Sequence, residues 1–378
     1  MNCPGLQEVK MVRAPMVQRG HGNWVRAVAY SPDGKLIATG GDDWLVLIWR
    51  ASDGKLLRSL EGHTGGVRSV NFSPDGKLLA SGSDDSTVRI WQSGEGKLLR
   101  SLEGHTGWVW SVNFSPEGKL LASGSDDSTA RIWQSGEGKL LRSLEGHTGG
   151  VLSVNFSPDG KLLASGSDDS TVRIWHSGEG KLLRSLEGHT GGVLSVNFSP
   201  DGKLLASGSY DSTVRIWQSG EGKLLRSLEG HTGGVRSVDF SPDGKLLASA
   251  GDDSTVRIWH SRDGKLLHVV EGDLGWVRAV AFAPNGKYLI AAGAKGRLQF
   301  IDVESGTTFL YRYDLGPGAW LDLLPDGRFN ASPEGLRYLS YTEMDADGRL
   351  TLNSYSAEEL TAEYYAPDAV RDLLARYV

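Results

Sequence analysis

The chain has 378 residues, with 40 Lys and Arg against 46 Asp and Glu, and a formal net charge of −6. Its single cysteine, Cys3, excludes an internal disulfide and favours a reducing compartment, so we expect a cytoplasmic protein. No stretch reaches the roughly 18 apolar residues that a membrane span needs, and the first residues lack the apolar core of a signal peptide.

The charge is unevenly distributed along the chain. Residues 314–378 contain 12 acidic and 5 basic side chains, a net charge of −7, which leaves residues 1–313 with about +1. A near-neutral body with an acidic end lacks the basic surface that nucleic-acid-binding proteins present. We therefore expect neither nucleic acid nor a membrane among the partners.

The first predicted element is an outer-type strand over residues 6–18, and a repeat of 42 residues follows it. The reference unit, residues 61–102, returns almost letter for letter from Glu103, Glu145, Glu187 and Glu229. A looser copy occupies 19–60 and a more eroded one 271–313. A period of 40–45 residues, with Gly-His near its start and Trp near its end, is typical of a propeller blade.

Each unit contains four short runs of β-favouring residues separated by turn signals. In the reference unit the predicted strands are 67–72, 77–81, 87–91 and 97–102, with Ser-Pro-Asp-Gly between the first two. One four-stranded unit cannot bury both of its faces, whereas units packed radially cover one another. The sequence therefore predicts an all-β propeller with seven clear blades.

The unit resembles the WD-repeat (WD40) family through Gly62-His63, Ser81, Asp85 and Trp91. The resemblance implies that these His, Ser, Asp and Trp side chains form a hydrogen-bonded chain that ties the outer loop to the third strand. Six units carry the complete set: His21, Thr39, Asp43, Trp49; His63, Ser81, Asp85, Trp91; His105, Ser123, Asp127, Trp133; His147, Ser165, Asp169, Trp175; His189, Ser207, Asp211, Trp217; and His231, Ser249, Asp253, Trp259.

The seventh unit lacks all four of these residues and has Asp273, Ala291, Lys295 and Ile301 in their places. We expect apolar packing alone to hold its blade. The resemblance also implies that the strand at 6–18 closes the ring by completing the last blade.

The recurrence of His, Ser and Asp invites a hydrolase interpretation, because such a set can activate a nucleophile. An enzyme needs one site that differs from its surroundings, whereas this set occurs six times with Trp as a fourth member. We interpret it as structural and expect neither an enzyme nor a cofactor. Asp345, Asp347 and Gly348 faintly resemble a calcium loop, but Ser354 stands where the bidentate Glu would be, so we expect no metal.

The segment 314–355 leaves two arrangements open. Aligning Pro325-Asp326-Gly327 with the first turn of the reference unit produces a degenerate eighth blade without the polar set. The alternative is a seven-bladed ring with this segment docked outside. Beyond it, residues 356–378 favour two short helices, one capped by Ser356 and one starting at Pro367, and the pattern of the whole tail resembles tails that follow WD repeats in large bacterial proteins.

Three columns of the aligned units vary while the framework holds. They hold the residue at the Gly66 position, the residue at the Arg68 position and the residue before the network Asp. In the family that the sequence resembles, these columns form a partner-binding face around the channel. The predicted face comprises Trp24, Arg26, Arg68, Trp108, Trp110, Leu152, Leu194, Tyr210, Arg236, Trp276 and Arg278.

This predicted binding face divides into two arcs, one apolar and aromatic in units three to five and one rich in Arg in the others. Trp, Tyr and Arg are enriched at interface hot spots. The leading hypothesis is a non-catalytic scaffold or sensor module that binds a protein or peptide here. The alternatives are a near-consensus or engineered scaffold without an evolved partner and, remotely, a hydrolase or lectin. We expect a monomer, with exchange of blades between chains as the route to an oligomer.

Overall fold

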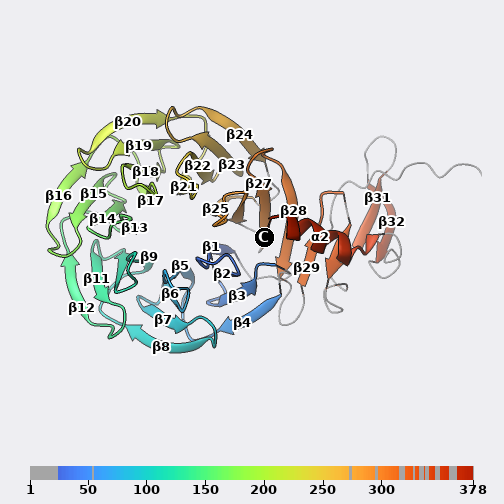
Figure 1. Ribbon diagram of the computed structural model, residues 1–378, viewed down its shortest axis with the longest axis horizontal. Coiled ribbons are helices and arrows are strands. Elements are labelled where there is room, and N and C mark those ends of the chain that lie inside the picture. Colours follow the sequence, from blue (N-terminus) through green and yellow to red (C-terminus); the bar gives the residue numbers. More distant parts are fainter. Residues whose placement is uncertain are drawn as a thin grey trace, which may run out of the picture.

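Seven antiparallel sheets stand radially around a central channel, as Figure 1 shows. The computed structural model describes residues 24–52, 55–271, 275–293, 297–314, 320–326, 328–331, 336, 340–344, 350–356 and 364–377. The ring closes because the innermost strand of the first blade packs against two strands of the seventh. The predicted all-β propeller is confirmed, with seven blades.

Each blade runs from the channel outward in chain order. The strands are β1 (Val25–Tyr30), β2 (Leu36–Gly41), β3 (Val46–Arg50) and β4 (Leu56–Leu60) in blade one; β5 (Val67–Phe72), β6 (Leu78–Ser83), β7 (Val88–Gln92) and β8 (Lys97–Leu102) in blade two; β9 (Val109–Phe114), β10 (Leu120–Ser125), β11 (Ala130–Gln134) and β12 (Leu140–Leu144) in blade three; and β13 (Val151–Phe156), β14 (Leu162–Ser167), β15 (Val172–His176) and β16 (Leu182–Leu186) in blade four. They continue as β17 (Val193–Phe198), β18 (Leu204–Ser209), β19 (Val214–Gln218) and β20 (Lys223–Leu228) in blade five; β21 (Val235–Phe240), β22 (Leu246–Gly251), β23 (Thr255–His260) and β24 (Leu266–Glu271) in blade six; and β25 (Val277–Phe282), β26 (Tyr288–Gly293), β27 (Arg297–Asp302) and β28 (Thr308–Asp314) in blade seven.

Apolar side chains shared between neighbouring blades form the core. Ala80, Val88 and Ile90 of blade two pack with Val109 and other side chains of blade three in one buried cluster. Gly82 permits the contact, because a Cβ there would lie 2.8 Å from Val109 Cγ1. A buried Val or Leu contributes about 1.5–3 kcal/mol, against about 1 kcal/mol net for a hydrogen bond. The shared clusters therefore supply most of the cohesion of the ring.

Side chains of the innermost strands also join neighbouring blades. Ser69 Oγ accepts the backbone N–H of Val112 at 3.0 Å, and Asn71 Oδ1 accepts that of Phe114 at 2.9 Å. The serine bond recurs at each junction up to blade seven. The second bond recurs from Asn113, Asn155 and Asp239, whereas Asn197 Nδ2 donates to Asp239 Oδ1 at 3.2 Å. Where they occur, the serine and asparagine of an inner strand therefore have a structural role that recurs with the repeat.

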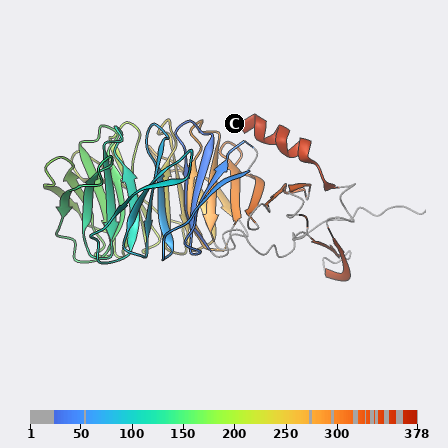
Figure 2. The same cartoon turned by 90° about the horizontal axis from the view of Figure 1, so that it is seen from below.

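The predicted eighth blade is wrong. Two further strands extend blade seven to a six-stranded sheet: β29 (Trp320–Leu323) pairs with the outer edge of β28, and β30 (Phe329–Ala331) pairs with β29. The pair β31 (Ser340–Met344) and β32 (Leu350–Ser356) forms a separate hairpin, which Figures 1 and 2 show away from the ring. The structure therefore has the second of the two arrangements left open by the sequence, a ring of seven with the segment outside.

One physical reason for this outcome is an ion pair between β28 and β29. Arg312 Nε lies 2.7 Å from Asp322 Oδ1, and both side chains are fully buried. The paired charges fix β29 on the edge of blade seven, because separating them would leave a buried charge without a partner. The strand predicted at 6–18 lies outside the described residues, and β28 occupies the outer position of the four-stranded unit in blade seven.

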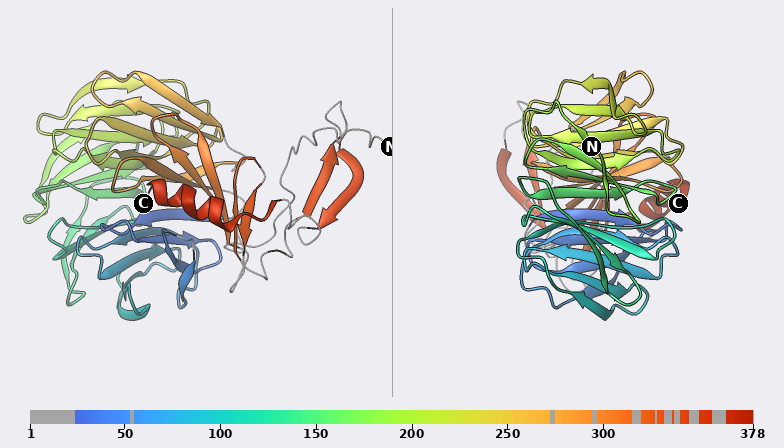
Figure 3. Two further views of the ribbon diagram at one scale, coloured as in Figure 1. Left: turned by 45° about the vertical axis from the view of Figure 1, so that its right-hand side comes forward. Right: turned by 90° about the vertical axis from the view of Figure 1, so that its left-hand side faces the viewer.

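The helix predicted from Pro367 is present as α2 (Pro367–Tyr377), which lies across the outside of the ring in Figures 1 and 3. Val370 and Leu374 are buried in the cluster that joins blades one and seven. The ring of Tyr377 stacks on Phe309 with centroids 4.1 Å apart. The other predicted helix, after Ser356, falls largely outside the described residues. Within the described ranges, no helix has the length and apolar character needed to cross a membrane.

Candidate binding face and the framework beneath it

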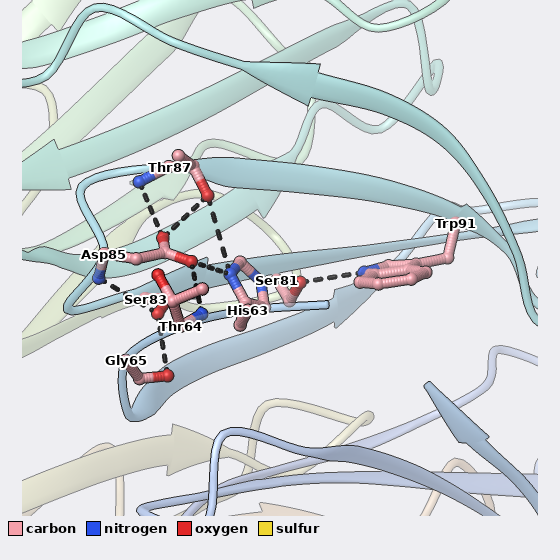
Figure 4. Close-up of polar contacts among 8 residues, drawn as sticks. All are labelled: His63, Thr64, Gly65, Ser81, Ser83, Asp85, Thr87 and Trp91. Atoms are coloured by element: carbon pink, nitrogen blue, oxygen red, sulfur yellow. Dashed lines mark hydrogen bonds and ion pairs between the residues drawn. The ribbon is translucent and has the colours of Figure 1, made fainter. Parts of the chain in front are cut away.

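The polar network of blade two joins the loop before β5 to strands β6 and β7 (Figure 4). Trp91 Nε1 donates to Ser81 Oγ at 2.8 Å. Ser81 Oγ lies 2.8 Å from His63 Nε2, and His63 Nδ1 lies 2.7 Å from Asp85 Oδ2. Asp85 also accepts the backbone N–H of Thr64 at 3.0 Å. The predicted chain is therefore continuous from the indole to the carboxylate.

Blades three to six repeat this geometry with nearly constant distances. His–Asp contacts are 2.7–2.8 Å, His–Ser contacts 2.7–2.8 Å and Trp–Ser bonds 2.8 Å. In blade one, Trp49 Nε1 donates to Thr39 Oγ1 at 3.0 Å, and Asp43 Oδ1 accepts the backbone N–H of Leu45. His21 lies outside the described residues.

A threonine two residues after the Asp belongs to the same network and was missed by the sequence reasoning. Thr87 Oγ1 donates to Asp85 Oδ1 at 2.7 Å, and its backbone N–H reaches the same oxygen at 3.0 Å. Its equivalents in blades three to six make the same two bonds. The signal was available, because a Thr recurs at this position in units two to six, whereas unit one has Leu45.

The donors and acceptors fix the protonation of the network. An indole N–H can only donate, so Ser81 accepts from Trp91 and has its own hydrogen for His63 Nε2. The imidazole then carries its hydrogen on Nδ1 and donates to Asp85. In blade four, burial lowers the pKa of His147 despite the opposing effect of Asp169. Burial acts to raise the pKa of Asp169, but hydrogen bonds from Thr171 and His147 outweigh it and hold that pKa at about 2.

The serine hydroxyls of this network are inaccessible from solvent. Ser81, Ser123, Ser165, Ser207 and Ser249 are each 0% exposed. A nucleophile must touch its substrate, and these hydroxyls are held beneath the loop and against a buried tryptophan. Their burial supports the structural interpretation of the His, Ser and Asp set.

Blade seven does not depend on apolar packing alone, so that prediction is wrong. Ala291 and Ile301 are fully buried, and Asp273 and Lys295 lie outside the described residues. The blade also contains the Arg312–Asp322 ion pair. Arg297 Nη1 donates to the Tyr313 hydroxyl at 2.9 Å. These polar contacts follow no repeat, so the period of the sequence carried no signal for them.

The variable columns converge on one end of the channel. A cavity of about 150 Å³ lies there. Eight members of the predicted face and one neighbour, Asp168, line it; the eight are Arg26, Arg68, Trp110, Leu152, Leu194, Tyr210, Arg236 and Arg278. Trp108 and Trp276 are 45% and 47% exposed. Trp24, the remaining member, packs edge-on against Trp276 with ring centroids 5.4 Å apart. The cavity and these tryptophans form what we call the mouth face.

Each arginine of the mouth face lies against an aromatic ring. The Arg68 guanidinium lies 5.0 Å from the ring centre of Trp110, and that of Arg236 lies 4.5 Å from Tyr210. Arg278 lies between Trp24 and Trp276, at 5.1 and 4.8 Å. The two predicted arcs are therefore not separate, because arginines of one arc pack on aromatic rings of the other.

Aspartates from the column before the network Asp neutralise three of the arginines. Arg68 Nε donates to Asp84 Oδ1 at 2.7 Å, and Arg236 donates to Asp252 at 2.6–2.9 Å. Arg26 pairs with Asp42 in the same way. These pairs fix the guanidinium groups at the mouth and reduce the net positive charge of the mouth face.

Trp44 is an exposed aromatic residue that the sequence reasoning missed. It is 52% exposed and has a φ of 72°, in the turn between β2 and β3. Serine takes the same conformation in blades two to six. A bulky residue in this region is strained, and a Trp in a column of serines was the available signal.

Comparison with known proteins matches the repeat unit throughout the ring. The sequence profile of the family described as "WD domain, G-beta repeat" matches residues 14–50, 54–92, 96–134, 138–176, 180–218, 222–260 and 264–302, more than half of the chain.

Individual curated proteins match over a single repeat. The small ribosomal subunit protein RACK1z of Oryza sativa subsp. japonica is 55% identical over 42 residues, 11% of this chain and 13% of its own. The cross-pathway control WD-repeat protein 2 of Flammulina velutipes is 45% identical over 42 residues, with the same shares. The nuclear distribution protein PAC1-1 of Uncinocarpus reesii is 46% identical over 44 residues, 11% of this chain and 10% of its own. Each match spans only about an eighth or less of the relative's length.

Proposed function

Because this chain belongs to the WD-domain, G-beta repeat family, we propose that it is a non-catalytic scaffold or sensor module that binds a protein on its mouth face. One observation carries the proposal. The repeated His, Ser and Trp side chains of the network are buried in the framework, whereas eight of the eleven side chains of the predicted face line one cavity. Drift without selection would leave differences scattered over all faces of the ring.

The composition of the mouth face supports a protein partner. Trp108, Tyr210 and Trp276 are each almost half exposed, and arginines lie beside them. Trp, Tyr and Arg dominate the residues that cost most when truncated in protein interfaces. Exposed aromatic rings pinned by neighbouring guanidinium groups lose little side-chain freedom on binding, which favours affinity.

The relatives' names are compatible with this role but do not supply the partner. They describe a ribosomal subunit protein, a control protein and a nuclear distribution protein, and each resemblance spans one repeat. They are eukaryotic, so the resemblance of the tail to bacterial proteins stays a prediction, as do the cytoplasmic location and the monomeric state.

The experiment is affinity capture followed by mass spectrometry with the intact protein and two variants. The face variant combines Trp108→Ala with Tyr210→Ala. The control variant combines Leu98→Ala with Leu224→Ala, two leucines about 40% exposed on the outer strands. The proposal expects the face variant to lose the captured protein and the control variant to retain it. Equal capture by all three would reject the mouth face.

A second candidate, a near-consensus scaffold without an evolved partner, is favoured by the near-identity of units two to six. It expects no protein that depends on the mouth face in any of the three captures. It also expects that substitutions at Trp108 and Tyr210 change the binding of no captured protein.

A further inference from the structure

The charged residues of the mouth face follow a pairing rule. In blades one, two and six, the arginine at the start of the innermost strand pairs with the aspartate in the following turn of the same blade. Blade four has Leu152 in the arginine position and keeps Asp168. Blade seven has Arg278, whereas residue 294 of the sequence is alanine. The Asp168 carboxylate and the Arg278 guanidinium therefore lack the same-blade partner that blades one, two and six provide at these positions.

Asp168 receives no hydrogen bond or ion pair from any side chain in the described part of the chain. Its Oδ1 lies against the start of blade five, where a Cβ on Gly192 would be 2.6 Å away. Asp126 is its charged neighbour, and burial together with the charges of Asp126 and Asp169 raises the pKa of Asp168. Asp126 itself accepts a hydrogen bond from Trp110 Nε1 at 2.5 Å. Blades three and four therefore present a negative pole.

Arg278 is the corresponding positive pole. Its Nη1 is 3.5 Å from Asp252 of the neighbouring blade, and its Nε is buried and has no hydrogen-bond partner among the described residues. Asp252 is already engaged by Arg236 at 2.6–2.9 Å. The guanidinium is held between two tryptophan rings, which fix it in place but accept no conventional hydrogen bond.

Both poles line the same cavity, together with Leu152, Leu194 and Tyr210. Blades four and seven are three places apart in a ring of seven, the largest separation that such a ring allows. The two unmatched charges therefore lie across the mouth from each other, with apolar and aromatic side chains between them. This arrangement is complementary to a ligand with a cation at one end and an anion at the other.

We propose that the cavity binds a peptide segment carrying both charges, with a Lys or Arg side chain against Asp168 and a carboxylate against Arg278. The inference rests on the proposed function and specifies its ligand. A cavity of about 150 Å³ is smaller than the roughly 300–1,000 Å³ of sites for whole small molecules, so it fits one or two side chains of a larger partner. The carboxylate is either an Asp or Glu side chain or the carboxyl terminus of the partner.

The test is a selection from a library of short random peptides, half with free and half with amidated carboxyl ends. The protein is used as the intact chain and as the variants Asp168→Asn and Arg278→Gln. Glu179→Gln and Lys181→Gln are matched controls, because both residues are exposed in the turn after β15, at the end of the strands opposite the mouth. Thermal unfolding of each variant establishes that it is folded.

The intact protein is expected to enrich peptides with one basic and one acidic group. Asp168→Asn is expected to weaken binding of these peptides at least about tenfold and to lose the basic preference, while Arg278→Gln loses the acidic one. The controls retain both preferences. Enrichment only among free carboxyl ends assigns the anion to the terminus, and equal enrichment in the amidated half assigns it to a side chain.

Three outcomes overturn the inference. The inference fails if no peptide is selected. It also fails if the enriched peptides do not carry both a basic and an acidic group. Enriched peptides that ignore both charge variants but are lost in Trp108→Ala would show that the mouth binds another class of ligand, leaving the proposed function intact. If the variants Trp108→Ala and Tyr210→Ala also bind the enriched peptides unchanged, both the inference and the proposed function fail.

Discussion

Asn71 accepts the backbone N–H of Phe114 in the next blade at 2.9 Å, and an equivalent bond recurs at three further blade junctions. Two junctions around blade one differ, because the corresponding side chains are Ala29 and Ala281. The serine column is likewise replaced by Ala27 and Ala279. Blade one is therefore joined to its neighbours without the side-chain bonds that link the others.

Restoring those bonds should stabilise the ring. In the double variant Ala27→Ser and Ala29→Asn, the new side chains are placed to accept the N–H groups of Val70 and Phe72. We expect the free energy of unfolding to rise by about 1 kcal/mol for the pair, measured by urea denaturation. A loss of stability would show that blade one packs too closely to its neighbour for larger side chains.

Removing the central hydroxyl of a network should destabilise the protein. Ser165→Ala leaves the Trp175 N–H and His147 Nε2 without their shared partner inside a buried site. We expect a loss of about 1–3 kcal/mol in the free energy of unfolding. The control is Ser143→Ala on an exposed outer strand, expected to change it by no more than about 0.5 kcal/mol. An equal change in the free energy of unfolding for the two variants would show that the network does not contribute to stability.

The networks should make the ring sensitive to acid. The His147 pKa is lowered in the folded state, so in mildly acidic solution the unfolded chain binds more protons and stability falls as the pH drops below about 6.5. The Asp169 and Asp211 pKa values of about 2 lie below their unfolded values. Their contribution is complete above about pH 4 and is lost as the pH falls toward 2. Unfolding temperatures should decline progressively from pH 7 to pH 3, and a flat profile would contradict the assignment.

Asp239 should have the opposite pH dependence. It stands where four preceding blades have asparagine, and burial raises its pKa to about 7. Because the folded state then holds a proton more tightly than the unfolded chain, stability falls as the pH rises from about 4 to 7. Asp239→Asn should therefore raise the unfolding temperature at pH 8 more than at pH 4. An equal change at both values would mean that Asp239 does not titrate in this range.

The sequence was sufficient for the parts of the structure that repeat. His63, Ser81, Asp85 and Trp91 could be located because six copies aligned them, and the strands followed from turn residues in fixed positions. Thr87 was recoverable from the same alignment and was overlooked.

The parts that occur once could not be derived in this way. Arg312 and Asp322 are ten residues apart on two strands, and nothing local in the sequence indicates that they meet in a buried pair. Without that pair, the turn signals of the tail left a further blade open as one of two arrangements. The mouth face lies between these cases, because its columns could be aligned, but which charges lack partners depends on contacts between blades.

We infer that the repeated residues hold the ring and that the residues breaking the repeat provide recognition. The variant Trp108→Gly with Tyr210→Asp tests this most directly, because it replaces two exceptions by the residues that other units have at the same positions. The measurement is the affinity for the captured partner at matched folded concentration. The account predicts an unfolding temperature unchanged or higher and an affinity reduced at least about tenfold. Undiminished affinity in a fully folded variant would contradict it.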